Sequence, residues 1–381
     1  MPVEMLALRE CVGRILRQDV QAERDNPPFD RVCMDGVAIA SSVFESGTRS
    51  FRLQATQAAG AAPLALDAPD AAIEVMTGAV LPGGTDSVIP LEEYDLHASA
   101  LALKPEATAE PWRNVQRRGS DSVPGVAMLT AGTRLGAAEI AVVASAGVAA
   151  IAVSRQPRIM VISTGDELIE PGQPIADHQV RRSNAYAVAA ALQLHGFAAV
   201  GDAHLPDEES FMLGRLGQIL AVNDVVVLSG GVSKGKFDFV PKVLKALGVE
   251  EVFDQVAQRP GRPMWFGVGP RGQLIFGLPG NPVSTLICLV RFVLPALRAA
   301  MLWRQAPPER IALAEPSGGR KMTYFMPVAL VPGAATLAAA SARPPKGSGD
   351  FLALAGTDGF AELPPRPDGY PQGFSADFYR W

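Results

Sequence analysis

The sequence has 381 residues, a formal net charge of −5, and 48% hydrophobic against 19% charged residues. Proteins that bind nucleic acids usually carry a basic stripe, so this balance argues against a nucleic-acid partner. Domains hold roughly 100–200 residues, so we expect roughly two to four of them. No run reaches the ~18 uninterrupted apolar residues of a membrane span, and the first residues lack a basic segment followed by an apolar core. We therefore expect a cytoplasmic protein without membrane contact.

The cysteines and histidines argue against a disulfide framework and against a metal site. The three cysteines, Cys11, Cys33 and Cys288, are widely spaced and form no CxxC pair. This pattern encodes neither a disulfide framework nor a zinc site. The four histidines form no HxxxH or HxH group, which makes a histidine-bound metal improbable.

The first part of the chain favours a helix followed by a small β domain. Residues 6–20 place apolar side chains near helical spacing, and the prolines at 27 and 28 would stop any helix. From residue 37 to about residue 94, short apolar runs are cut by Gly, Pro and Asp, which is typical of short strands. An alanine-rich stretch at 137–150 predicts a second helix that packs back on the first.

Residues 157–301 alternate strand and helix patterns, which indicates a parallel sheet with helices on its faces. The runs 158–162 and 224–228 are apolar without alternation, as in strands buried on both faces. Glycines and caps predict three helices, over 183–194, 239–247 and 281–301. Beyond residue 308, short strands punctuated by Pro and Gly predict a compact C-terminal β domain.

Three apolar strands lead directly into glycine-bearing loops, at 163–167 (STGDE), 229–233 (SGGVS) and 277–281 (GLPGN). Ligands of open α/β sheets lie beyond the carboxyl ends of the strands. Glycine there lets backbone N–H groups approach an anion, and a helix that begins at Pro282 adds its positive dipole end. One such loop is a weak signal, because glycine often merely ends a strand, but three predict a phosphate-binding cleft.

Two segments match the patterns of nucleotide-binding motifs but lack the residue or the structural context that each motif requires. Residues 230–236 satisfy GxxxxGK, but Phe237 stands where a P-loop needs a Ser or Thr hydroxyl for magnesium. Residues 267–272 satisfy GxGxxG, yet they separate two short strand-like runs and predict a hairpin turn.

Carboxylates beside the loops suit a magnesium ion, which is usually held by one or two carboxylates together with phosphate oxygens and water. The candidates are Asp35, Asp121, Glu167 and Asp238. Each of them alone is more often a turn former or a helix cap than a ligand. Basic side chains that could hold an anion are Lys234, Lys236, Arg259, Arg262 and Arg320. Ordinary solvated surface charge is the alternative for each of these.

Taken in order, several runs resemble the molybdopterin molybdenumtransferases, the family of bacterial MoeA and the E domain of gephyrin. The matching runs are 28–30 (PFD) with 34–36 (MDG), 76–79 (MTGA), 117–121 (RRGSD), 163–168, 229–233 with Asp238, 259–263 (RPGRP) and 277–284. No single run is decisive, but the ordered combination is highly specific.

The resemblance implies an α/β multidomain fold in four parts, assembled as an elongated homodimer. The implied parts are a discontinuous helical linker domain (1–36 and 112–154), an inserted β domain (37–111), a parallel-sheet α/β molybdopterin-binding domain (155–303) and a small C-terminal β-barrel domain (304–381). The cleft would lie between the α/β domain of one subunit and the N-terminal domains of its partner.

The reaction implied by the resemblance inserts molybdate into adenylylated molybdopterin and releases AMP, with Mg²⁺ assisting. Asp238, Asp35 and Glu167 are the implied catalytic residues, with Asp238 and Asp35 holding the metal. The implied substrate-binding residues are Thr77, Asp121, Thr164, Gly165, Ser229, Gly230, Gly231, Ser233, Arg259, Arg262, Pro279, Gly280, Asn281, Arg320 and Ser348. A molybdopterin adenylyltransferase and the recipient molybdoenzymes are the further partners that the resemblance suggests.

The chain departs from the family pattern at two acidic positions. Arg182 stands where the family commonly has Asp, and Lys236 stands where it often has Asp. Both changes make the site more basic, which should favour anions and weaken a second cation site. Two alternatives therefore stay open. One is a binding or scaffold protein without turnover, and the other is a magnesium-dependent adenylylation of molybdopterin, which the additional domains disfavour.

Overall fold

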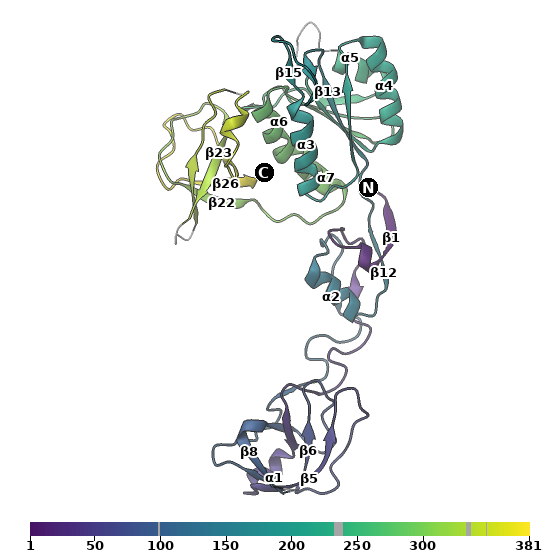
Figure 1. Ribbon diagram of the computed structural model, residues 1–381, viewed down its shortest axis with the longest axis vertical. Helices are drawn as coiled ribbons and strands as arrows, with labels where there is room; N and C mark the ends of the chain where they lie inside the picture. The colour runs from purple at the N-terminus through teal and green to yellow at the C-terminus, as the bar shows by residue number, and fades with distance from the viewer. Residues whose placement is uncertain (98–99, 232–238, 333–336, 348) are drawn as a thin grey trace.

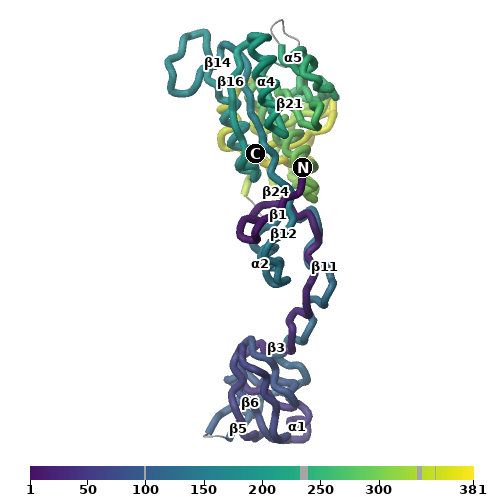
Figure 2. The backbone as a smooth tube through the Cα atoms, turned by 90° about the vertical axis from the view of Figure 1, so that its right-hand side faces the viewer, coloured from purple at the N-terminus to yellow at the C-terminus, as the bar shows by residue number. Residues whose placement is uncertain are grey.

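The computed structural model describes residues 1–97, 100–231, 239–332, 337–347 and 349–381. The molecule is elongated (Figure 1). An α/β domain and a C-terminal β domain lie at one end, and a small β domain lies at the other. The chain crosses the narrow segment between the two ends twice, once in each direction (Figure 2).

The α/β domain is built on a sheet of six strands. In spatial order these are β16 (Val200–Leu205), β13 (Ile159–Thr164), β17 (Val225–Ser229), β21 (Leu274–Leu278), β20 (Trp265–Val268) and β18 (Glu250–Phe253). The first four run parallel, while β20 and β18 are antiparallel additions. The two central apolar runs are buried except for the half-buried Met160, as the lack of alternation predicted, and each large apolar side chain buried there contributes roughly 1.5–3 kcal/mol.

Helices cover both faces of this sheet (Figure 1). One face carries α4 (Glu209–Val222) and α5 (Val240–Ala246). The other carries α3 (Ser183–Leu194) and a long helix made of α6 (Pro282–Cys288), a π-helical turn (Leu289–Val293) and α7 (Leu294–Ala300). The three predicted helices are therefore confirmed, and so is the hairpin between β20 and β21.

The long helix Pro282–Ala300 is apolar enough by length and composition to cross a membrane. It nevertheless packs within the α/β domain, and 56% of its most apolar window is buried there. Because it contributes Val283, Ile287 and Leu294 to the main hydrophobic core, it is accounted for as a core helix.

The inserted β domain has one six-stranded sheet. Its strands, in spatial order, are β7 (Ser87–Pro90), β4 (Gly36–Ile39), β6 (Ala71–Val75), β5 (Ser50–Gln57), β9 (Ala100–Leu103) and β8 (Tyr94–His97). A short helix, α1 (Ser41–Glu45), and a 3₁₀ turn (Leu91–Glu93) complete it. Gly36 is required at the start of β4, because a Cβ there would lie 2.0 Å from the carbonyl oxygen of Ile89.

The segment between the two ends is mostly extended, so the expected helix over 6–20 and the helical character of the linker are wrong. β1 (Val3–Ala7) pairs with β12 (Ala150–Ser154), and the short strands β2 (Val20–Gln21) and β3 (Arg31–Val32) pair with β11 (Ala127–Leu129) and β10 (Val115–Gln116). A 3₁₀ turn (Leu8–Glu10) follows β1. These partners lie more than 80 residues away in sequence, and local apolar spacing does not reveal them. The one α-helix described here, α2 (Ala137–Ser145), ends earlier than predicted because Ala150 already begins a strand.

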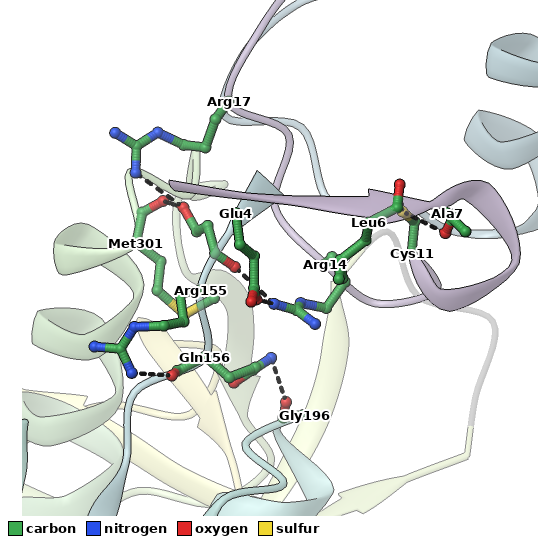
Figure 3. A network of polar contacts seen from close by, with 11 residues as sticks. Glu4, Leu6, Ala7, Cys11, Arg14, Arg17, Arg155, Gln156, Gly196 and Met301 are labelled. Atoms are coloured by element: carbon green, nitrogen blue, oxygen red, sulfur yellow. Dashed lines mark hydrogen bonds and ion pairs between the residues drawn. The ribbon is translucent and has the colours of Figure 1, made fainter. Parts of the chain in front are cut away.

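A polar network fastens this segment to the α/β domain (Figure 3). Ser154 donates through Oγ to the carbonyl of Met301 over 2.6 Å, and Gln156 donates through Nε2 to the carbonyl of Gly196 over 3.1 Å. Beside them Arg14 pairs with Glu4. The linker therefore contacts the carboxyl-terminal ends of both α3 and α7.

The C-terminal domain is a small closed barrel, as expected. Its strands are β22 (Glu309–Leu313), β23 (Thr323–Val331), β24 (Ala338–Ala342), β25 (Gly359–Leu363) and β26 (Ser375–Arg380). The ring closes because β23 pairs with both β24 and β25. The two-residue strand β19 (Gln258–Arg259) of the α/β domain also pairs with β23, and a 3₁₀ turn (Phe351–Ala353) precedes β25. The barrel is therefore joined to the edge of the predicted cleft.

Candidate functional site

The three glycine-bearing loops come together at the carboxyl edge of the parallel sheet, as predicted. The side chain of Asn184, in the first turn of α3, donates to Ser229 Oγ over 2.9 Å and to the carbonyl of Gly280 over 2.7 Å. Gly230 and Gly231 have φ of +92° and +66°, and a Cβ on Gly231 would lie 2.7 Å from Thr164 Oγ1. Only glycine allows the second loop to approach the first so closely.

A first cavity of about 440 Å³ lies among these loops. Its walls include Ser163, Thr164, Asn184, Ser229 and Asn281. The hydroxyls of Ser163 and Thr164 and the Oδ1 of Asn184 are buried and have no hydrogen-bond partner among the described residues. Because unpaired buried polar groups are costly, the cavity is suited to a polar ligand.

Glu167 is the one predicted catalytic carboxylate that the structure places at this cavity. Gly165 has φ of +135°, and a Cβ on it would lie 2.5 Å from Glu167 Oε2, so the carboxylate lies directly against the bare glycine backbone. Two short strands, β14 (Leu168–Ile169) and β15 (Val180–Arg181), follow and continue the same wall.

Arg182 also lines the first cavity, but its charge is locally paired. Arg182 as a whole residue is 8% exposed. Its guanidinium donates to Glu170 Oε2 over 2.8 Å and forms a close ion pair with Asp202. Tyr186 donates its hydroxyl to the same Glu170. The extra positive charge expected from Arg182 is therefore offset by two carboxylates, which the sequence comparison did not foresee. Lys236, the second departure, lies outside the described residues.

A second cavity of about 460 Å³ lies on the other side of the loop 279–281, between the α/β domain and the barrel. Its cations are Arg259, Arg262 and Lys346, and no ion pair with a carboxylate is found for them in the described part of the chain. Asn281 lines both cavities. This half of the site is therefore suited to an anion. Lys346 was not among the candidates, because its place in a Pro- and Gly-rich loop carries no signal of its own.

Buried side chains stabilise the loop that carries Arg259 and Arg262. Buried Gln258 donates through Nε2 to the carbonyls of Pro260 and Gly261 over 3.3 and 3.2 Å. Gly261 has φ of +91°, and a Cβ on it would lie 2.6 Å from the sulfur of Cys288. Burial raises the pKa of this thiol to about 12, so Cys288 is a neutral packing group.

The amino end of the long helix faces both cavities. Asn281 is its N-cap residue and Pro282 its first residue, and the Asn281 side chain makes no capping hydrogen bond. The N–H groups of the first turn therefore have no side-chain cap, and the positive end of the helix dipole points toward the site.

Asp35 and Thr77 hydrogen-bond to each other but do not lie at the cleft. Thr77 donates both its N–H and its hydroxyl to Asp35 Oδ1, each over 2.6 Å. These two hydrogen bonds lower the pKa of Asp35 below its usual 3.8. Asp35 directly precedes β4 and Thr77 follows β6, and the inserted β domain that holds these strands lies at the opposite end of the molecule from the α/β domain (Figures 1 and 2). Asp121 lies in the connecting segment and accepts from Gln116 over 2.8 Å.

The remaining candidates are placed only in part. Arg320 donates to the carbonyls of Gly318 and Gly319, and its guanidinium stacks 4.4 Å from the ring centre of Tyr324, which lines the second cavity. Ser233, Asp238 and Ser348 lie outside the described residues, as does Lys234. Among the residues that are described, no group of three or more metal-ligating side chains occurs.

Glycine loops and an exposed helix N-terminus at the edge of a parallel sheet, next to a cationic cavity, define a multidomain α/β protein with a site suited to a polar anionic ligand. Two family models match the chain, "MoeA N-terminal region (domain I and II)" over residues 1–147 and "Probable molybdopterin binding domain" over 160–299. A Synechocystis molybdopterin molybdenumtransferase is 39% identical over 370 residues, 97% of this chain and 93% of that protein. A Staphylococcus aureus protein of the same name is 30% identical, over 99% and 91% of the two chains.

Solved structures agree with this. A molybdopterin biosynthesis MoeA protein from Pyrococcus horikoshii OT3 has a TM-score of 0.82 at 25% identity, covering 100% of this chain and 95% of that one. The chain therefore belongs to the molybdopterin molybdenumtransferase family, whose members are enzymes of molybdenum cofactor biosynthesis.

Proposed function

We propose that this protein inserts molybdate into adenylylated molybdopterin and releases AMP, with Mg²⁺ assisting, in the cytoplasm. The observation that carries the proposal is the pair of cavities on the two sides of the loop 279–281. One is polar and lined by unpaired hydroxyl and amide oxygens, and the other is cationic. Two such neighbouring cavities suit a reaction between an elongated pterin phosphate and a small oxyanion.

The first cavity would hold the pterin-phosphate substrate. The backbone N–H of Gly231 and those of the first turn of the long helix would donate to phosphate oxygens. Ser163, Thr164 and Asn184 would hydrogen-bond polar ring atoms. A Cβ on Gly280 would lie 3.7 Å from the Cα of Gly230, so two of the glycine loops lie side by side at this point.

The second cavity would hold molybdate. The guanidinium groups of Arg259 and Arg262 and the ammonium of Lys346 provide charge-assisted donors for a tetrahedral dianion. Asn281, shared by both cavities, would lie between the two substrates. Holding both substrates at neighbouring positions would lower the entropic part of the barrier.

Mg²⁺ would neutralise the charge that builds on the leaving phosphate. We assign Asp238 as its main ligand and Asp35 as an assisting one, with Glu167 beside the phosphate. The fit rests on oxygen chemistry, because carboxylate and phosphate oxygens are the ligands magnesium prefers, and the Glu167 carboxylate lines the first cavity.

The position of Asp35 supports a homodimer. Asp35 and Thr77 lie far from the cleft of their own chain, so they could assist only at the cleft of a second copy. The elongated shape leaves the inserted domain free to reach such a partner (Figure 2). The adenylyltransferase that makes the substrate and the enzymes that receive the product are the further partners we propose.

The test is an assay of AMP release by the purified protein, supplied with adenylylated molybdopterin and Mg²⁺, with and without molybdate. We expect release that depends on molybdate and is lost in Asp238→Ala. Tight substrate binding without AMP release would instead support the scaffold function that Arg182 suggests. ATP consumption in the absence of molybdate would support an adenylyltransferase.

A further inference from the structure

A third cavity, of about 660 Å³, lies away from the two cavities of the proposed reaction. It is lined by Arg134 of the linker segment, by His195 at the carboxyl end of α3, by the long helix from Val290 to Arg298, by the connection 303–309 and by the barrel strand β26. The amino end of α3 lines the first cavity and its carboxyl end lines this one, so the helix separates the two by ~18 Å.

Arginines dominate the lining of this cavity. Two of its five arginines have carboxylate partners, since Arg291 pairs with Glu362 and Arg380 pairs with Glu309. The other three are Arg134, Arg298 and Arg304, and no carboxylate partner is found for any of them in the part of the chain that the structure describes.

Two of the unpaired arginines share one indole ring. The guanidinium of Arg134 lies 5.2 Å from the ring centre of Trp303, and that of Arg298 lies 4.8 Å from it. Arg298 also donates to Nδ1 of His195 over 3.1 Å, which leaves the proton of the neutral imidazole on Nε2. Nε2 of His195 and Nε of Arg298 are both buried, and neither finds an acceptor within the described parts of the chain. The site is thus rich in donors and poor in acceptors.

Burial and the two neighbouring arginines lower the pKa of His195, and burial and Arg134 lower the pKa of Arg298. Both shifts agree with a positive local potential. Helix dipoles offset only part of it, because each carboxyl end carries about −0.5 charge. The two helix ends therefore balance about one of the three unpaired arginines.

We propose that this third cavity is a second anion site, which binds a tetrahedral oxyanion such as phosphate, free or attached to a nucleoside. Arg134 and Arg298 bind the oxyanion, and Trp303 holds the two guanidinium groups side by side. The volume lies within the usual 300–1,000 Å³ of small-molecule sites, which leaves room for a group attached to the anion. The site is independent of the proposed reaction, because it shares no residue with the first two cavities.

The test is calorimetric titration of the full-length protein with inorganic phosphate, AMP and molybdate at low salt. Arg134→Gln changes an exposed side chain and should preserve the fold, and Arg298→Gln probes the deeper arginine. We expect each to weaken oxyanion binding about tenfold, the effect of one charge-assisted hydrogen bond. Arg215→Gln, on the exposed face of α4, is the matched control and should leave binding unchanged.

Arg262→Gln separates this site from the second cavity. Binding that survives Arg262→Gln but is weakened by Arg134→Gln supports the proposal. If AMP binds more tightly than phosphate through the same arginines, the natural ligand is a nucleotide, and if it does not, the ligand is the free oxyanion. Oxyanion binding that Arg262→Gln abolishes completely, or that Arg134→Gln affects no more than Arg215→Gln does, would overturn it.

Discussion

Asn184 donates a hydrogen bond to Ser229 over 2.9 Å, and this contact joins the first turn of α3 to the glycine loop that follows β17. The same amide holds the carbonyl of Gly280 over 2.7 Å. One side chain therefore connects two of the three loops, while its Oδ1, at the first cavity, has no hydrogen-bond partner among the residues that the structure describes. Asn184 is thus both a brace for the loops and a free acceptor for a ligand.

Asn184→Ala should raise the KM for adenylylated molybdopterin about tenfold, because it removes the brace and the free acceptor together. Two lost hydrogen bonds should also lower the free energy of unfolding by roughly 1–2 kcal/mol. Steady-state kinetics and urea denaturation measure the two effects. Asn223→Ala is the control, since Asn223 Nδ2 donates to the carbonyl of Ile219 in its own helix, away from the loops. Equal effects of the two variants on KM would contradict the assignment.

We predict that Arg182 is needed to neutralise Glu170 and Asp202 and is not needed for catalysis. Arg182→Gln leaves Glu170 and Asp202 facing each other without a cation, and we expect roughly 1–2 kcal/mol loss in the free energy of unfolding because both carboxylates are partly solvated. Arg182→Asp should be less stable still, since it gathers three carboxylates. Adding Glu170→Gln and Asp202→Asn to the Arg182→Asp variant should recover most of its loss in the free energy of unfolding. An Arg182→Asp variant more stable than Arg182→Gln would show that the pairing is unimportant.

Gly261 should be irreplaceable in the loop that carries Arg259 and Arg262. Gly261→Ala places a Cβ 2.6 Å from the sulfur of Cys288 at a φ of +91°, so the loop must shift. We expect a higher KM for molybdate and roughly 1–3 kcal/mol lower stability. Gly272→Ala, at φ +78° with nothing within 4 Å, is a matched control that carries only the backbone strain. If both variants have the same KM for molybdate, the contact with Cys288 does not position the arginines.

The pair Asp35 and Thr77 should make stability depend on pH in the acid range. The pKa of Asp35 is depressed in the folded state, so its contribution is present above the unfolded value of about 3.8 and is lost as pH falls through the folded pKa. Thr77→Val removes the hydroxyl donor but keeps the backbone donor, so the pKa of Asp35 should move part of the way back. Carboxyl carbon chemical shifts of Asp35 against pH measure this. An unchanged titration curve would contradict the hydrogen-bond cause, and Thr56→Val, in the same sheet, controls for a general effect.

The α/β domain could be predicted because its signals are local. The runs at 159–162 and 225–228 are apolar throughout, and burial on both faces of a parallel sheet is the physical reason. Two helices of this domain end at glycines that the sequence shows directly. Gly196 and Gly248 adopt the positive φ values that end α3 and α5. The meeting of the three loops then followed from the parallel order of the strands.

What the sequence did not reveal depends on partners far away in the chain. Residues 6–20 have helical spacing, but the start of this segment pairs with 150–154, and backbone hydrogen bonds to that strand outweigh the local preference. Arg182 looked like an unpaired cation, and its partners Glu170 and Asp202 become visible only when β14, β15 and β16 are placed. The third cavity likewise draws its arginines from three parts of the chain.

We propose above that the two cavities on either side of the loop 279–281 bind different substrates of one reaction. The most direct measurement is the KM of Arg262→Gln and of Asn184→Ala for both substrates, in the AMP-release assay. We expect Arg262→Gln to raise the KM for molybdate about tenfold and to leave the KM for adenylylated molybdopterin unchanged, and we expect Asn184→Ala to do the reverse. If both variants raise both KM values equally, the two cavities do not divide the substrates in this way.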